Sequence, residues 1–138
     1  MKSFEVITFM LVFTLITLVG CEKDENEKQD NLQQTGIIGK WKLESRSIDG
    51  ISSLAVECCD YIEFKTDNEL DDFKGEFMAY GTGYETTGEF ELNTTENTIH
   101  FDYNNTCRSY EYQIFAGLLE FIYMEDDQKI GEDWRKEE

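Results

Sequence analysis

Residues 89–103 read EFELNTTENTIHFDY, and this stretch decides the fold. Apolar and polar side chains alternate on both sides of a polar centre, so Phe90 and Leu92 share one face of the chain, as do Ile99 and Phe101. Strict alternation is typical of a β-strand with one buried face, because successive side chains of a strand point to opposite sides. The Asn, Thr and Glu residues between the two runs favour a tight turn. The stretch therefore predicts an antiparallel hairpin.

The same alternation runs from Gly36 to the end of the printed sequence. Short clusters of Gly, Asn, Asp and Thr separate most of the runs, and Asp49 to Cys58 is the one long connection. Consecutive hairpins give an up-and-down order, and closing eight strands into a barrel removes the exposed edges of an open sheet. We therefore predict an all-β fold, an eight-stranded antiparallel up-and-down barrel. Its predicted strands are Ile38–Ile48, Cys59–Thr66, Glu69–Tyr80, Gly83–Asn93, Thr98–Tyr103, Cys107–Ala116, Leu118–Glu125 and Lys129–Glu137.

Alternation also assigns the side chains that face the interior of the barrel. They are Trp41, Leu43, Ile62, Phe64, Phe90, Leu92, Ile99, Phe101, Tyr112, Ile114, Leu119, Phe121 and Tyr123. The interior of an eight-stranded barrel is either just filled by side chains or holds one small ligand, and the sequence does not choose between these. If a cavity exists, we expect an apolar one with tyrosine hydroxyls as its polar groups. The candidate lining residues are Ile62, Phe64, Phe101, Tyr112, Phe121 and Tyr123.

The motif Gly39-Lys40-Trp41 opens the first predicted strand. A Gly-x-Trp motif in this position, followed by an eight-strand meander, resembles the lipocalins and their smaller bacterial lipocalin-like relatives. The resemblance implies that Trp41 closes the base of the barrel and that an arginine from near the end of the chain, here Arg135, covers it. The predicted strands are shorter than those of full-length lipocalins.

The first residues have the pattern of an export signal. Lys2 precedes a charge-free apolar run from Val6 to Val19, which is shorter than the roughly 20 residues that span a bilayer. The run ends in Leu18-Val19-Gly20-Cys21, which resembles the bacterial lipobox. The resemblance implies that residues 1–20 are a lipoprotein signal peptide and that Cys21 carries the lipid after cleavage. An uncleaved membrane anchor is the alternative, and both place the domain outside the cytoplasm.

Residues 22–28 are charged or polar throughout and offer nothing to bury. We therefore assign residues 21–35 to the lipidated cysteine and a disordered tether, and residues 36–138 to the barrel. The order of Cys21, Glu22, Lys23 and two acidic residues also resembles a signal that sends some Gram-negative lipoproteins to the cell surface. We expect a protein that is lipid-anchored in the bacterial outer membrane, on its periplasmic or its cell-surface side.

Three further cysteines are available for a disulfide: Cys58, Cys59 and Cys107. In an up-and-down barrel the second and sixth predicted strands begin at the same end, which brings these thiols together. Because the compartment is oxidising, we predict a bond between Cys59 and Cys107, with Cys58 as the alternative partner. A vicinal bond between Cys58 and Cys59, or three free thiols, are the competing possibilities.

Composition and motifs argue against several classes of function. The chain has 30 acidic and 12 basic residues, a formal net charge of -18, and no basic cluster, so nucleic acid is a poor partner. The lone His100 lies between two inward residues and should face solvent, away from any catalytic or metal site. We predict no catalytic site, no metal site and no cofactor. The glutamates that alternate with the inward set are Glu44, Glu63, Glu91, Glu111 and Glu120.

Two functions remain. The first is a membrane-anchored envelope lipoprotein whose barrel binds a small hydrophobic ligand. The second is a structural or interaction protein with a filled barrel that engages another envelope component. The sequence does not identify a protein partner for either.

Overall fold

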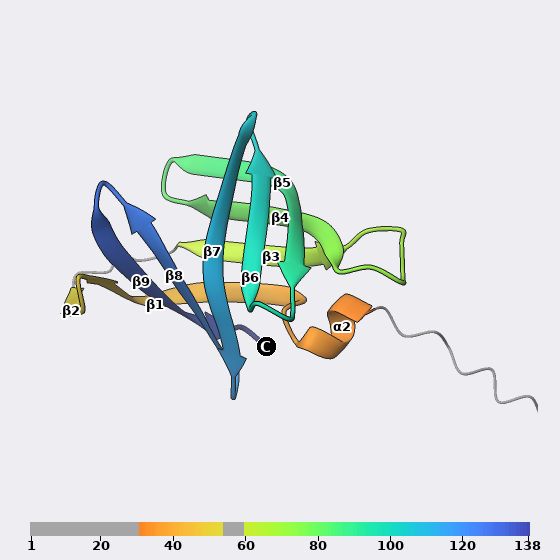
Figure 1. Ribbon diagram of the computed structural model, residues 1–138, viewed down its shortest axis with the longest axis horizontal. Helices are drawn as coiled ribbons and strands as arrows, with labels where there is room; N and C mark the ends of the chain where they lie inside the picture. Colours follow the sequence, from red (N-terminus) through yellow and green to blue (C-terminus); the bar gives the residue numbers. More distant parts are fainter. Residues whose placement is uncertain (1–30, 54–59) are drawn as a thin grey trace, which may run out of the picture.

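The computed structural model describes residues 31–53 and 60–138. Within these residues, eight antiparallel strands close into a barrel, because β1 pairs with β3 on one side and with β9 on the other (Figure 1). The predicted all-β up-and-down barrel is confirmed. Its strands are β1 Gly39–Ile48, β3 Tyr61–Thr66, β4 Lys74–Gly81, β5 Tyr84–Asn93, β6 Thr98–Tyr103, β7 Thr106–Phe115, β8 Leu118–Glu125 and β9 Gln128–Lys136.

The hairpin expected in residues 89–103 is formed by β5 and β6. Phe90 lies opposite Phe101 and Leu92 opposite Ile99, and all four side chains are buried. The strand expected at Glu69–Tyr80 begins later, at Lys74. Before Lys74, side chains take backbone hydrogen bonds that a strand would use: the Glu69 amide donates to the Asp67 carboxylate at 2.8 Å.

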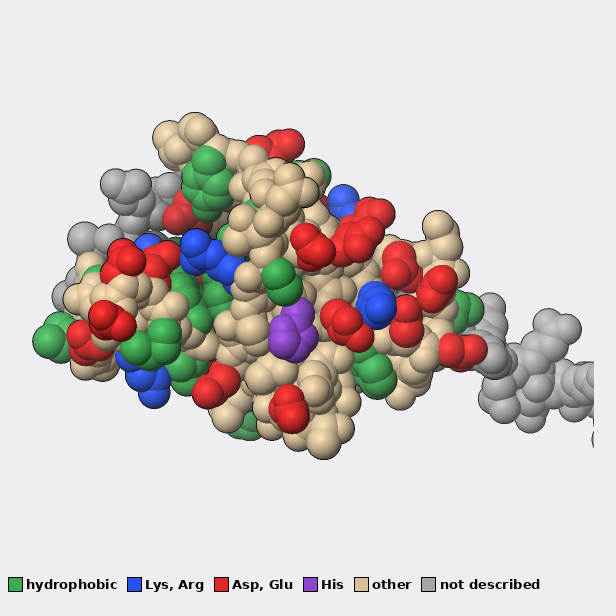
Figure 2. All heavy atoms as spheres, turned by 45° about the horizontal axis from the view of Figure 1, so that its top comes forward, with side chains coloured by type: hydrophobic (Ala, Val, Ile, Leu, Met, Phe, Trp, Pro, Cys, Tyr) green, Lys and Arg blue, Asp and Glu red, His purple; other side chains and the backbone are tan. Residues whose placement is uncertain are grey.

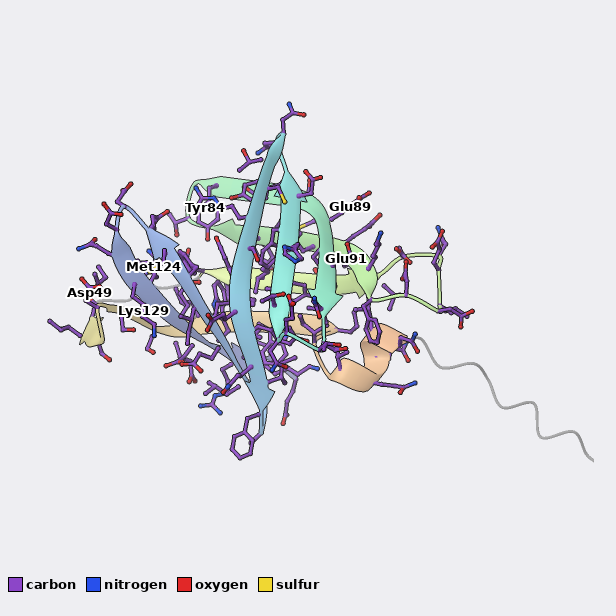
Figure 3. All side chains as sticks on the ribbon, in the orientation of Figure 1. Asp49, Tyr84, Glu89, Glu91, Met124 and Lys129 are labelled. Atoms are coloured by element: carbon purple, nitrogen blue, oxygen red, sulfur yellow. The ribbon has the colours of Figure 1, made fainter. Side chains whose placement is uncertain are left out.

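A short strand, β2 (Ile51–Ser53), adds to the edge of β1 and was not predicted. Asp49 and Gly50 connect the two strands with φ values of 51° and 80°, which is the backbone of a two-residue hairpin turn. The Asp49 amide donates to the Lys129 carbonyl at 2.8 Å, and the Lys129 amide donates to the Asp49 carboxylate at 2.9 Å. Figure 3 shows this pair beside Met124, where the β1–β2 turn meets the β8–β9 hairpin.

The second unpredicted element is a short helix, α2 (Asn31–Thr35), at the opposite end of the barrel (Figure 1). Leu32 is fully buried, and a Cβ placed on Gly75 of β4 would lie 3.1 Å from its Cδ1 atom. The Asn31 amide donates to the Leu70 carbonyl at 3.1 Å. The disordered tether expected over residues 21–35 is therefore wrong for 31–35, since this segment folds against the barrel. Residues 21–30 lie outside the described residues.

The interior follows the predicted alternation. Of the thirteen side chains assigned to the inner face, all are buried except Ile114, which is partly buried and packs against the others. In the half of the barrel nearer α2, the Phe64 and Phe90 rings pack with their centroids 4.9 Å apart. The Phe77 and Phe101 rings, whose centroids are also 4.9 Å apart, lie further from α2. Across residues 31–53 and 60–138, no helix is long and apolar enough to cross a membrane.

Candidate functional site

The end of the barrel opposite α2 contains a cavity of about 280 Å³. This is the end at which β1 stops, β3 starts and the β4–β5, β6–β7 and β8–β9 turns lie. Ligand cavities in proteins usually measure about 300 to 1,000 Å³, so this one suits a small molecule. Its apolar lining consists of Leu43, Ile62, Phe77, Ala79, Phe101, Phe121 and Trp134.

Four of the six predicted lining residues do face this cavity: Ile62, Phe101, Phe121 and Tyr123. Phe64 and Tyr112 do not line this cavity. Phe64 is 1 % exposed and belongs to the aromatic packing nearer α2. Tyr112 lies near the turn between β5 and β6, where its amide donates to the Asn97 carbonyl at 2.9 Å. Alternation reports which face a side chain takes, but not how deep along the barrel it lies.

A buried acidic residue, Glu132 of β9, lies in the wall of the cavity and was missed in the sequence. Its Oε1 atom accepts from Arg46 Nη2 at 2.7 Å and from the Tyr123 hydroxyl at 2.9 Å, while Oε2 accepts from Trp134 Nε1 at 3.2 Å. Arg46 Nη2 also donates to the Tyr123 hydroxyl at 2.9 Å. The sequence does contain a signal for it. Glu132 lies two positions from both Ile130 and Trp134, so alternation along the strand places its side chain on the inward face with theirs.

A second arginine, Arg108 of β7, faces the same cavity. Its Nη1 atom donates to Glu125 at 3.2 Å, and its guanidinium also hydrogen bonds with the Tyr110 hydroxyl. The Tyr110 and Tyr123 rings are stacked, with centroids 4.1 Å apart and planes 14° apart. Stacking thus connects the two arginine–tyrosine pairs across β7 and β8.

Three tyrosines of the cavity, Tyr84, Tyr110 and Tyr123, are held in the protonated form. Burial raises the pKa of Tyr110, and burial together with the Glu132 carboxylate raises the pKa of Tyr123. Burial and a hydrogen bond to Asp60 raise the pKa of Tyr84 to about 12. At neutral pH these hydroxyls are therefore uncharged and able to donate hydrogen bonds.

The base of the barrel differs from the sequence expectation in one residue. Trp41 is fully buried, and its Nε1 atom donates to the Ile37 carbonyl at 2.7 Å. Arg135 does not cover it, because Arg135 points outward and donates to both Glu44 oxygens at 3.0 and 2.9 Å. The cation over the Trp41 ring is Lys136, whose Nζ atom lies 5.1 Å from the ring centroid. Lys136 lies directly opposite Trp41 in the β1–β9 register.

Cys107 is exposed at the start of β7. The predicted bond joins it to Cys59 or Cys58, and both of these lie outside the described residues. The disulfide stays a prediction. We predicted the disulfide from two strands that begin at the same end of the barrel, and in the described residues β3 and β7 do begin at the same end.

The outer face of β4, β5 and β6 carries a depression lined by acidic side chains and His100. Figure 2 shows the histidine at the surface with acidic side chains beside it. Glu76 lies directly opposite Glu89, and Glu89 opposite Asp102. Among the residues that the structure describes, no group of three or more His, Cys, Asp or Glu side chains is placed to hold a metal ion.

Comparison with known proteins identifies the family. Neither the search of curated proteins nor the search of solved structures returned a match. A protein-family model described as "Lipocalin-like domain" matches residues 37–121, which extend from just before β1 into β8. The match covers more than half of the chain and agrees with the closed antiparallel barrel. The chain therefore belongs to the family of lipocalin-like domains.

Proposed function

We propose that this protein binds a small, mainly apolar molecule in the cavity at the open end of its barrel. The observation that carries the proposal is the uneven filling of the interior. Fully buried Leu32, Ile37 and Ile99 pack the half nearer α2, whereas the other half leaves about 280 Å³ behind a wall of Leu, Ile, Phe and Tyr side chains. Burial of apolar ligand surface against such a wall favours binding by about 25 cal/mol per Å².

Fixed polar groups support the same proposal. The cavity wall includes Arg46, Tyr123 and Glu132, which hold one another by the hydrogen bonds given above. Ligand cavities typically combine an apolar lining with a few such positioned polar groups, which orient the ligand. Because the groups are already bonded to each other, they need little rearrangement when a ligand enters.

A cavity-filling variant tests this function. The protein can be exported behind an ordinary cleavable signal peptide as residues 22–138, which includes every described residue and requires no detergent. Native mass spectrometry should detect a copurifying small molecule, and an environment-sensitive apolar dye should bind. Ala79→Phe, which adds a ring inside the cavity, should abolish both signals. Met78→Phe is the matched control, because Met78 lies on the outer face of the same strand.

Equal dye binding by Ala79→Phe and the unchanged protein would contradict binding at this site. Absence of any bound molecule or dye from the unchanged protein would favour the alternative, an interaction protein. One observation supports that alternative: the opposed acidic side chains Glu76, Glu89 and Asp102 on the outer face. Like charges directly opposite each other destabilise a sheet, so a cationic partner surface would relieve them.

We further propose that the protein is anchored by lipid on Cys21 in the bacterial outer membrane. The support is the Leu18-Val19-Gly20-Cys21 sequence at the end of a short apolar run. Labelled fatty acid should enter the unchanged protein in cells, and Cys21→Ser should carry none. Label in the Cys21→Ser protein would exclude this anchoring.

A further inference from the structure

The turn between β7 and β8 presents an exposed aromatic ring, that of Phe115, whose exposed fraction is 80 %. Ala116 and Gly117 form the turn, with φ values of 49° and 75°, and Leu118 lies opposite Phe115 in the register. These four residues carry no charge. A single exposed ring is normal on a protein surface, so the surroundings of the turn decide whether it has a partner.

The β7–β8 turn lies beside α2, the first described element of the chain. Lys136 joins the two, because its amide donates to the Gly117 carbonyl at 3.0 Å and its Nζ atom donates to the Gly36 carbonyl at 2.8 Å. Gly36 directly follows α2, and a Cβ placed on it would lie 3.9 Å from Ile114. Figure 1 shows the end of the chain between α2 and the end of β7. The chain therefore enters the barrel at the end where Phe115 is exposed.

The length of the chain before α2 limits which part of the barrel can reach a membrane that holds lipid on Cys21. Ten residue steps join Cys21 to Asn31, and they span at most about 35 Å. A ten-residue strand such as β1 is about 33 Å long, and tilted in a barrel it rises about 25 Å. The α2 end can therefore lie on this membrane with length to spare, whereas contact through the cavity end would take up most of the connection.

The cavity end also has exposed apolar side chains, on the β1–β2 and β8–β9 turns. Ile51 is 77 % exposed and Met124 is 65 % exposed. Carboxylates lie next to both, since Asp49 is in the first turn and residues 125–127 of the second are Glu, Asp and Asp. A membrane surface that contains anionic lipids repels such groups, and moving them out of water is costly. Charge therefore argues against docking through this end.

The charges nearest to Phe115 have the opposite sign. Arg135 lies opposite Leu118 in the β8–β9 register, although it is paired with Glu44. Lys136 is exposed and makes no ion pair within residues 31–53 and 60–138, since its ammonium group bonds a backbone carbonyl. Surfaces that lie in the membrane interface combine apolar side chains with lysine or arginine. The β7–β8 turn and the end of β9 supply both kinds of group.

We propose that the β7–β8 turn docks on the phospholipid bilayer that holds the Cys21 lipid, with Phe115 in the interface and Lys136 at the head-group phosphates. This inference rests on the proposed lipid anchor and adds an orientation, in which the cavity opens away from that bilayer. Burial of one phenylalanine favours association only about tenfold to a hundredfold. The anchor makes this weak contact effective, because it keeps the turn at a high local concentration beside the bilayer.

Photocrosslinking of the lipidated full-length protein tests this orientation. Benzoylphenylalanine replaces Phe115 in one variant and Met124 in its matched control, an exposed apolar residue at the cavity end. Mass spectrometry verifies the lipid on each purified protein, which is then reconstituted in vesicles of phosphatidylethanolamine and phosphatidylglycerol. Phospholipid adducts at position 115 should exceed those at position 124 at least tenfold. In residues 22–138, which lack the lipid, adducts at position 115 should fall at least tenfold.

The outcomes separate the docking from the anchor. Equal adduct yields at positions 115 and 124, a higher yield at 124, or no adduct at either position overturns the docking and leaves the anchor standing. Equal yields at position 115 with and without the lipid overturn it too, because the probe would then report non-specific contact. A purified full-length protein without lipid would overturn the anchor and the docking together, while ligand binding in the cavity would be unaffected.

Discussion

At the scale of single residues, the hydrogen bonds that its carboxylate accepts allow Glu132 to lie beside the apolar core. It is 7 % exposed, and it is the one buried charged residue in the described part of the chain. A buried carboxylate without partners would be very costly, but this one accepts from a guanidinium, a hydroxyl and an indole. Glu132 therefore holds three side chains of the cavity wall in position.

Replacing this carboxylate should be costly. Glu132→Leu removes the common acceptor of Arg46, Tyr123 and Trp134, and we expect a loss of about 3 kcal/mol in the free energy of unfolding. The measurement is urea denaturation. Glu44→Leu removes a carboxylate from an exposed pair on the outer face and should have a far smaller effect. Equal losses in the two variants would contradict the structural role of Glu132.

Trp41 acts at the other end of the barrel. Its ring is fully buried and does not line the cavity. Trp41→Ala should lower the free energy of unfolding by about 3 to 5 kcal/mol without changing ligand affinity. Trp41→Phe keeps a ring in place and should cost less. An unchanged melting temperature for Trp41→Ala would show that the ring does not seal the base.

At the scale of elements, α2 extends the folded domain beyond the barrel strands. Five residues are too few for a stable isolated helix, so its formation depends on packing. Leu32 supplies that packing, and Gly75 provides the space, since a Cβ there would also lie 2.3 Å from the Lys65 carbonyl oxygen. The helix thus closes the filled end of the barrel.

Leu32→Ala tests whether α2 belongs to the cooperative unit. Removing a fully buried leucine should cost about 2 to 5 kcal/mol. Gln33→Ala is the control, because Gln33 is an exposed neighbour in the same helix. Both can be measured by thermal unfolding of residues 22–138. Identical melting temperatures would mean that α2 unfolds separately from the barrel.

At the scale of the whole molecule, tyrosine burial couples stability to alkaline pH. The pKa values of Tyr84, Tyr110, Tyr112 and Tyr123 are all raised above 10.0, first of all by burial. The unfolded chain therefore loses these protons at lower pH than the folded protein does. Their contribution to stability is fully present below pH 10 and is lost as pH rises through the folded-state values.

We expect the urea midpoint to fall as pH rises from about 10 to about 12. Other groups also titrate in this range, so the diagnostic result is a difference between proteins. Tyr123→Phe should show a shallower decline than the unchanged protein, because it has one fewer raised pKa. Parallel declines would contradict a special contribution of Tyr123.

Much of this fold is decided locally and could be predicted. Side chains alternate faces along any strand, so the buried set, the hairpin at residues 89–103 and the closed barrel all follow from patterns of a few residues. The predicted resemblance to the lipocalins agrees with the match to the lipocalin-like domain. Four cavity residues were predicted on the same basis.

The other features, such as the partners of Glu132 and Trp41, depend on which strands become neighbours. Only the tertiary structure decided them. Arg46 meets Glu132 across 86 positions of sequence only when β1 closes against β9. The same closure places Lys136, rather than Arg135, over Trp41. Alternation is a property of one strand, whereas depth in the barrel, the partner of a buried charge and the docking of α2 are properties of the closed sheet.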